Sequence, residues 1–331
     1  MENNKANISA EPQNVGTLNM YKTGFGGGRI EWIDIAKGIG IILVVLGHIT
    51  PRGSFINDFI YVFHMPLFFI CCGLCFKGNT SFRDLLKKRL RQLMLPFIFF
   101  FMMTAPICIY IAKDYALNRI LNDAPYALWF LPVLFISELF FWEICHYLKN
   151  KKYMLLAICI LFLAGYVLYK YKIGIPYSLS AVFHATAFIG IGFYVKNMNY
   201  RYKLLTAITL FVLLSASVLF VLPKESFNLI HNKLGPEYYG FLFSLLGAFM
   251  VIALSQKIKS NRFLSFFGQN SLGIMCIHFP LLSIVTEFVK PVIVNHIIYK
   301  CIELTIVLFG ALLISILFEK YFPFVMGKIK K

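Results

Sequence analysis

Long apolar runs, separated by short polar connections, dominate the chain from residue 32 onward. Each run is about twenty residues long, which is the length that an α-helix needs to cross the hydrocarbon core of a bilayer. A helix pairs its backbone polar groups within the segment, so it is the form expected of such runs in lipid. The pattern predicts ten transmembrane helices, at residues 32–50, 55–76, 92–112, 126–148, 153–169, 177–195, 204–222, 238–256, 264–286 and 295–318.

Composition leads to the same class of protein. Of the 331 residues, 59% are apolar and only 14% are charged, which is too little polar surface for a water-soluble domain of this size. We therefore expect an all-α polytopic membrane protein. Residues 1–31 are polar and end in a Gly-rich stretch, so they are expected to form a disordered cytoplasmic leader. Residues 32–320 form the expected membrane domain, and residues 321–331 form a basic cytoplasmic tail.

The Lys and Arg residues predict an orientation. If the leader and the even-numbered connections lie on one side of the membrane, that side carries about three times as many of these residues as the other. The bias places both termini in the cytoplasm, as an even number of helices requires. Topology thus accounts for much of the net charge of +17, and no nucleic-acid-binding motif accompanies that charge.

The first predicted helix carries three ionisable side chains. Lys37 and His48 are eleven positions apart, which places them on one helix face, about 16 Å apart along the axis. Asp34 lies near the same line. An interfacial ion pair explains Asp34 and Lys37 equally well, and we place both at the cytoplasmic mouth of the bundle. It does not explain His48, because intramembrane ionisable groups usually face a bundle interior or an aqueous cavity.

Three other histidines fall at a similar expected depth. By the helical rise, His48, His64, His184 and His278 all lie in the outer half of a ~30 Å core. Each alone is better explained by an interhelical hydrogen bond, but four at one level indicate a polar chamber. Glu138 also lies inside a predicted helix, where it needs a partner or a proton.

Cys72 and Cys75 form a C-x-x-C pair. In an apolar segment this pattern favours small-side-chain packing over a metal or redox centre, so no metal site is predicted. Trp129 lies near the expected outer edge of its helix, where it fits an aromatic belt better than a sugar-stacking role. Glu303 follows Lys300 by three positions, a spacing that suits a helical ion pair.

As an ordered set, five stretches resemble the acyltransferase-3 family of integral-membrane O-acyltransferases, including its fucose 4-O-acetylase-like branch. They are "RIEWIDIAKGIGIILVVLGHI", "FIYVFHMPLFFICCGLCF", "DLLKKRLRQLMLPFIFF", "LWFLPVLF" and "FLSFFGQNSLGIMCIHFPLL". The resemblance implies transfer of an acyl group, usually acetyl from acetyl-CoA, to a carbohydrate hydroxyl. The family's basic-residue-x10-His signature falls on Lys37 and His48, which implies that His48 is essential. It also implies that Arg89 and Arg91 lie on the acyl-donor side. The sequence departs from the family at Cys72, where a Ser is common.

The chemistry of acyl transfer suits these residues. A histidine is the usual general base for a sugar hydroxyl, and we assign that role to His48, with His64, Glu138, His184 and His278 as support in the chamber. Cationic side chains can bind the phosphates of CoA, so Arg89, Arg91 and Lys37 are the predicted donor-binding residues. The basic segment 77–91 is equally typical of a loop that anchors anionic lipid.

We therefore expect a multi-pass O-acetyltransferase in a bacterial cytoplasmic membrane. It would use acetyl-CoA or another acyl-CoA as co-substrate, need no bound cofactor, and act on a cell-surface or lipid-linked carbohydrate, alongside polysaccharide-assembly proteins. Two other interpretations stay open. One is a transporter or exporter of a polar solute or glycan, although no internal repeat favours it. The other is a non-catalytic scaffold of a polysaccharide machine.

Overall fold

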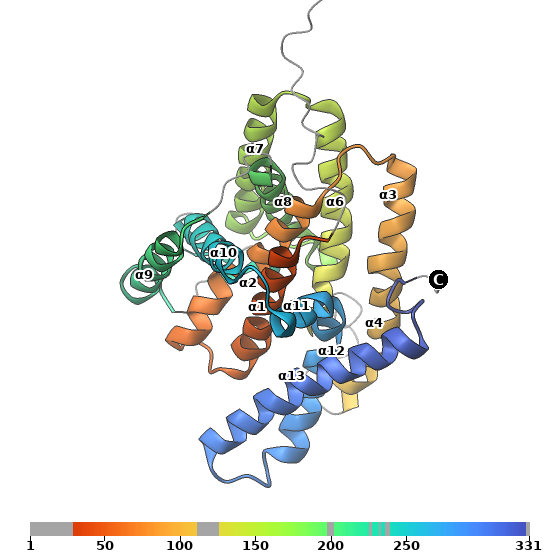
Figure 1. The fold of residues 1–331 in the computed structure, drawn as a ribbon, viewed down its shortest axis with the longest axis vertical. Helices are drawn as coiled ribbons and strands as arrows, with labels where there is room; N and C mark the ends of the chain where they lie inside the picture. The colour runs from red at the N-terminus through yellow and green to blue at the C-terminus, as the bar shows by residue number, and fades with distance from the viewer. Residues whose placement is uncertain are drawn as a thin grey trace, which may run out of the picture.

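A computed structural model describes residues 29–110, 126–196, 202–224, 227–231, 233–235 and 239–328. The predicted leader lies outside these residues up to position 28, and so does the end of the predicted tail. The α-helices described are α1 (Glu31–Ile49), α2 (Phe55–Cys75), α3 (Phe82–Arg89), α4 (Leu95–Tyr110), α6 (Phe130–Tyr147), α7 (Lys151–Lys170), α8 (Val182–Lys196), α9 (Leu204–Phe220), α10 (Tyr239–Ile258), α11 (Arg262–Gln269), α12 (Ser271–Val289) and α13 (His296–Tyr321). Figure 1 shows that they form one helical bundle.

Short elements complete the described part of the chain. A π-helical turn, η1 (Leu90–Met94), joins α3 to α4, and 3-10 turns form η2 (Tyr126–Trp129), η3 (Pro176–Ala181) and η4 (Leu229–His231). Two strands, β1 (Phe227–Asn228) and β2 (Lys233–Leu234), pair in antiparallel fashion on either side of η4.

The predicted class is confirmed. Among the described residues, nine helical segments are long and apolar enough to cross a membrane. The remaining predicted span corresponds to α9, which is apolar but has only 17 residues. The chain is therefore an all-α, multi-pass membrane protein.

Two predicted boundaries are wrong, and both errors concern short polar helices. The predicted loop 77–91 is helical from Phe82 because Ser81 caps the helix, its hydroxyl accepting a hydrogen bond from the Asp84 backbone N–H at 3.2 Å. The predicted span 264–286 is two helices, since the chain breaks at Asn270 between α11 and α12. Asn261 caps the start of α11 through the Leu264 N–H, at 2.9 Å.

α1 and α2 lie at the centre of the bundle (Figure 1), and most of each helix is buried, whereas α7 and α13 are largely exposed at the periphery. The central helices meet their neighbours through glycines. A Cβ at Gly38 of α1 would lie 2.0 Å from the Leu264 carbonyl oxygen of α11, and one at Gly268 would lie 1.8 Å from the Asp34 carbonyl oxygen. The two backbones are thus in direct contact, as small residues permit between membrane helices.

A second helix crossing, between α2 and α8, is also held by direct contact between the two backbones at glycines. A Cβ at Gly73 would lie 2.0 Å from the Ile189 carbonyl oxygen, and one at Gly192 would lie 2.1 Å from that of Ile70. Both central helices are therefore fixed to a neighbour by backbone contact near the end of α1 that carries Lys37 and the end of α2 that carries Cys75.

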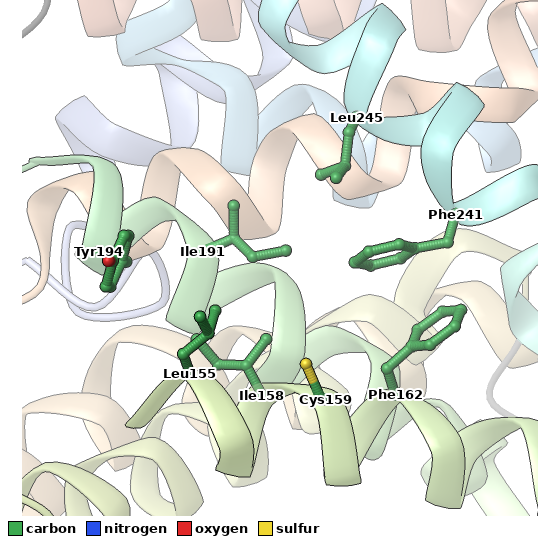
Figure 2. Close-up of a pocket in the computed structure, with 8 residues that line it drawn as sticks. All are labelled: Leu155, Ile158, Cys159, Phe162, Ile191, Tyr194, Phe241 and Leu245. Atoms are coloured by element: carbon green, nitrogen blue, oxygen red, sulfur yellow. The ribbon is translucent and has the colours of Figure 1, made fainter. Parts of the chain in front are cut away.

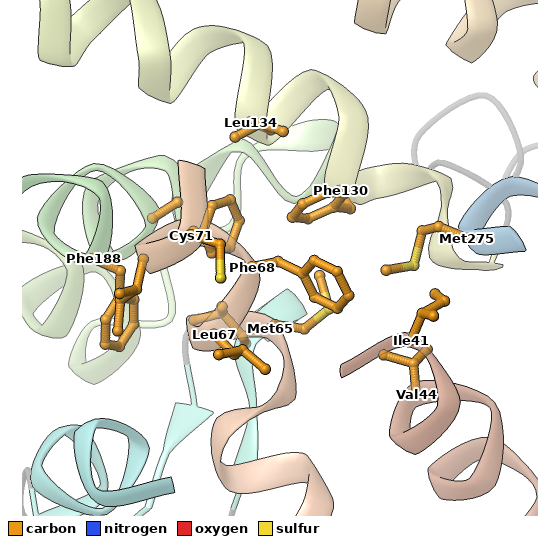
Figure 3. Packing of buried hydrophobic residues seen from close by; sticks show 14 of the residues in the cluster. Ile41, Val44, Met65, Leu67, Phe68, Cys71, Phe130, Leu134, Phe188 and Met275 are labelled. Carbon is orange, nitrogen blue, oxygen red and sulfur yellow. The ribbon is translucent and has the colours of Figure 1, made fainter. Parts of the chain in front are cut away.

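The apolar core fills the middle of the bundle between these helices. Figure 3 shows Ile41 and Val44 of α1 in one layer with Phe68 of α2, Phe130 of α6 and Met275 of α12. The rings of Phe68 and Phe130 are 6.1 Å apart. Ile41 and Val44 stand four and seven positions after Lys37, so they continue the helix face that carries Lys37 and His48. The apolar layer therefore separates these two polar side chains.

Candidate functional site

His48 occupies the last turn of α1, where it meets α2. Its Nδ1 lies 2.7 Å from the hydroxyl oxygen of Tyr61, a hydrogen-bond distance between the two helices. Gly47, the residue before it, brings α1 close to α2: a Cβ there would lie 3.0 Å from the Ile60 side chain. His48 as a residue is half-buried, with neighbouring helices covering most of its surface.

Three of the four predicted histidines come together here. The ring of His48 lies 5.4 Å from that of His278, nearly parallel to it, and 6.4 Å from that of His64. Phe279 closes one side, with its ring 4.3 Å from that of His48. We call His48, His64, His278 and Tyr61 the histidine cluster. His64 is 5% exposed and His278 is 0% exposed, so His48 is the accessible member.

The two buried histidines have a defined proton arrangement. Nδ1 of His64 lies 2.9 Å from the Ile60 carbonyl oxygen, and Nδ1 of His278 lies 3.0 Å from the Ile274 carbonyl oxygen. A carbonyl oxygen can only accept, so each Nδ1 carries the hydrogen and each neutral ring keeps its lone pair on Nε2. Among the described residues, Nε2 of His278 is buried with no hydrogen-bond partner. The cluster thus holds acceptor capacity beside His48.

His184 lies elsewhere. It packs against α7, where its ring is 5.2 Å from that of Phe162 and a Cβ at Gly165 would lie 2.5 Å from it. Of the four histidines predicted to share a chamber, His48, His64 and His278 therefore lie together, and the structure does not place His184 with them.

Tyr61 was not predicted, although the sequence carried a signal for it. It stands three positions before His64, which puts the two side chains on one face of α2, and their rings are 5.0 Å apart. A second signal is a repeated pattern, because His64 and His278 each stand two positions before a proline within a helix, Pro66 and Pro280. Pro66 has no backbone N–H, so it cannot donate the helical hydrogen bond to the Val62 carbonyl oxygen. The Ser244 hydroxyl donates to that oxygen instead, at 2.8 Å.

The opposite end of α1 carries a second polar group. The buried Asp34 carboxylate forms an ion pair with Arg29, and the Lys37 Nζ lies 3.8 Å from the same carboxylate. The Lys37 side chain is partly exposed and lies near the end of α2 that carries Cys72 and Cys75. Asp34 and Lys37 are thus paired, as expected of an ion pair at a spacing of three residues.

Glu138 has the partner that its position in α6 requires. Its carboxylate is 1% exposed, accepts a hydrogen bond from Nη2 of Arg89 at 2.7 Å and forms an ion pair with Nε of the same guanidinium. Arg89 Nη1 also donates to the Gln92 side-chain oxygen at 3.0 Å. Arg91, the other predicted donor-binding arginine, is exposed. The structure therefore places Glu138 with Arg89, away from the histidine cluster.

The histidine cluster and the charged region around Lys37 lie at opposite ends of the buried face of α1. Cys72 interacts electrostatically with Glu138, Lys37 and Arg89, so these three side chains lie in one region around the end of α2. Ile41 and Val44 separate that region from His48 along α1. The arrangement suits a reaction in which a charged cosubstrate binds at one end and an acid–base group acts at the other.

Two further sequence predictions can be placed. Trp129 is buried beside Phe130 within the bundle, so the prediction of a lipid-facing belt residue is wrong. Residues of η2 contact α12, and this contact takes Trp129 out of the lipid interface. The Lys300–Glu303 ion pair is confirmed at 2.7 Å, with the buried Glu303 carboxylate also bound by Tyr299 and Thr286.

Comparisons with known proteins identify relatives of this chain. The family described as "Acyltransferase domain" (acyltransferase 3) matches residues 30–320. Nodulation protein NolL of Sinorhizobium fredii is 39% identical over 79 residues, which cover 20% of this chain and 22% of the relative. The match to that relative thus spans about a fifth of its length. No solved structure matches the chain.

Proposed function

The chain belongs to the acyltransferase-3 family, and on this basis we propose that it transfers acetyl from acetyl-CoA to a hydroxyl of a cell-surface or lipid-linked carbohydrate. Membership makes it a membrane acyltransferase. The observation that supports the finer proposal is the half-buried imidazole of His48, held by Tyr61 and surrounded by two buried histidines. We place it in a bacterial cytoplasmic membrane, with both termini in the cytoplasm.

His48 acts as the general base in this proposal. Its Nε2 takes the proton of the acceptor hydroxyl while the hydroxyl oxygen attacks the thioester carbonyl carbon. The C–S bond then breaks, the acetyl group stays on the acceptor oxygen, and the CoA thiolate takes the proton to leave as the thiol. For Nε2 to accept a proton, Nδ1 must carry the hydrogen, which it donates to the Tyr61 oxygen.

The charged region at the other end of α1 suits the acyl donor. Lys37 is partly exposed and Arg91 is exposed, so both cations can meet phosphate groups of CoA. Arg89 is engaged with Glu138, so it reaches a phosphate only by sharing or leaving that carboxylate. We keep Arg89, Arg91 and Lys37 as donor-binding residues and assign Glu138 to holding Arg89.

The pantetheine arm of CoA links the two ends. Lys37 and His48 are about 16 Å apart along α1, and the layer between them is apolar. Pantetheine carries amide groups but no charge, so it would cross this layer at lower cost than a charged solute once the side chains move apart to admit it. The same packed layer counts against the transporter interpretation, which needs a polar route between the two sides.

The test uses membranes from cells that make either the wild-type protein or His48→Gln. They are supplied with isotope-labelled acetyl-CoA, and the label in the surface glycan is measured by mass spectrometry. We expect His48→Gln to lose about 10²-fold or more of the transfer rate, as removal of a general base does. His146→Gln, at an exposed histidine of α6, is the matched control and should keep the wild-type rate. Equal labelling by wild-type and His48→Gln would exclude the proposed role of His48.

A further inference from the structure

Two cavities in the bundle differ sharply in character. One, of about 350 Å³, lies between α7, α8 and α10 and is lined by apolar side chains such as Ile158, Phe162 and Phe241 (Figure 2). The other, of about 320 Å³, lies where α7, η3 and η4 meet, and polar side chains make up half of its lining, the rest being Leu168, Ile173, Gly174, Ile175 and Ile230. The polar side chains are Tyr169, Lys172, Ser178, Ser180 and His231. We call this second one the polar cavity.

The polar side chains of this cavity are available to a ligand. Ser178 and Ser180 are only 8% and 6% exposed, so they form its floor, while Lys172 and His231 are exposed at its rim. None of the five polar side chains makes a hydrogen bond to another described residue. The hydroxyls of Ser178 and Ser180 line the cavity, so a molecule that enters it can exchange hydrogen bonds with them.

The backbone around the cavity is held in an unusual conformation. Lys172 and Ser178, which line it, and Tyr177 beside it have φ angles of 53°, 58° and 57°. These left-handed values are uncommon for residues other than glycine, and such residues cluster at ligand-binding sites. The conformation presents the Ser178 side chain to the cavity instead of continuing a regular helix into α8.

The cavity and His48 lie at the same end of the bundle. Successive spans alternate in direction, so the end of α1, the start of α2, the end of α7 and the start of α8 share one side. The β1–β2 hairpin that contains η4 also contacts α2, the helix of Tyr61. A chain-like acceptor could therefore occupy the polar cavity while another of its units reaches His48.

We propose that the polar cavity binds sugar units of the acceptor glycan. Its volume suits about one or two sugar rings, and its hydroxyls, imidazole and ammonium group can exchange hydrogen bonds with sugar hydroxyls. The Tyr169 ring offers an apolar face to the C–H side of a sugar. The role of this binding in acetyl transfer rests on the proposed function, but the binding itself does not.

The test measures binding to the full-length protein purified in detergent. The probe is fluorescently labelled oligosaccharide, released by mild acid from the surface of the cells that make the protein. Wild-type protein should bind it. Ser180→Leu, which fills the cavity, and Lys172→Ala should each weaken binding by about tenfold or more, because each removes hydrogen bonds to the ligand. Lys170→Ala, at an exposed lysine of α7 outside the cavity, is the matched control.

Each outcome has a meaning. Wild-type affinity in Lys172→Ala and in Ser180→Leu overturns the proposal, and so does the absence of binding by the wild-type protein. If Ser180→Leu does not fold, the exposed Lys172 and a Tyr169→Ala variant decide the matter. If binding depends on the cavity but the wild-type protein transfers no label from acetyl-CoA, the glycan site stands and the proposed acetyl transfer fails.

Discussion

The hydroxyl oxygen of Tyr61 and Nδ1 of His48 lie 2.7 Å apart, which joins α2 to the last turn of α1. This contact decides which nitrogen of His48 can act as a base. If Tyr61 accepts from Nδ1–H, then Nε2 is free to take a proton; if Tyr61 donates, Nε2 carries a hydrogen and cannot. Tyr61 is therefore a positioning residue, acting through His48.

Replacing Tyr61 by phenylalanine should lower kcat by about tenfold while leaving KM for acetyl-CoA unchanged. The ring stays in place, so only the hydrogen bond that orients His48 is lost. The ¹⁵N resonances of His48 should also shift from a single Nδ1–H tautomer to a mixture. Tyr147→Phe, at an exposed tyrosine of α6, should change neither quantity. An unaltered tautomer in Tyr61→Phe contradicts the positioning role.

The Arg89–Glu138 pair should be costly to break from one side. Glu138→Leu leaves a guanidinium without its partner at a mostly buried place, and we expect a loss of about 3–5 kcal/mol in stability. The double variant Arg89→Met, Glu138→Leu removes both charges and should recover most of that loss. Thermal unfolding in detergent measures both.

The same double variant separates two roles of Arg89. If Arg89 binds the donor, the double variant is stable but has a raised KM for acetyl-CoA. If its role is only to pair with Glu138, then KM stays at the wild-type value once stability is restored. A kinetic measurement on the stable double variant distinguishes the two.

Gly38→Ala should destabilise the protein strongly because the new methyl group would lie 2.0 Å from a backbone oxygen of α11. The two helices must separate to admit it, at a cost of about 1–3 kcal/mol or more. Gly73→Ala should behave in the same way at the α2–α8 crossing. Gly174→Ala is the control, since no heavy atom lies within 4 Å of the added group, and its unfolding temperature should not fall.

The sequence was informative about what each helix contains and less so about how the helices face one another. Run length predicted the long helices, but α3 and α11 are short and partly polar, so a search for twenty apolar residues missed them as separate helices. Helical rise predicted a common depth for four histidines. The helical rise does not give the direction in which a side chain points around the helix axis. The sequence therefore could not show that His184 points toward α7 and away from the other three histidines.

The partners of buried charges also depended on packing. Glu138 was expected to need a partner, but Arg89 is 49 residues away along the chain, and only the packing of α3 and η1 on α6 brings it close. Tyr61 was overlooked because its hydroxyl is ordinary in an apolar helix until a histidine of another helix meets it.

Backbone contact between Gly38 and α11 has a consequence for substrate choice. It fixes one end of α1 against α11, and the same helix carries His48 at its other end, so α1 sets the distance between the charged end and the imidazole. If the acyl donor binds at the charged end, as we propose, a donor with no arm, such as acetyl phosphate, would be too short to reach His48, and the enzyme should discriminate among activated acetyl compounds by their length.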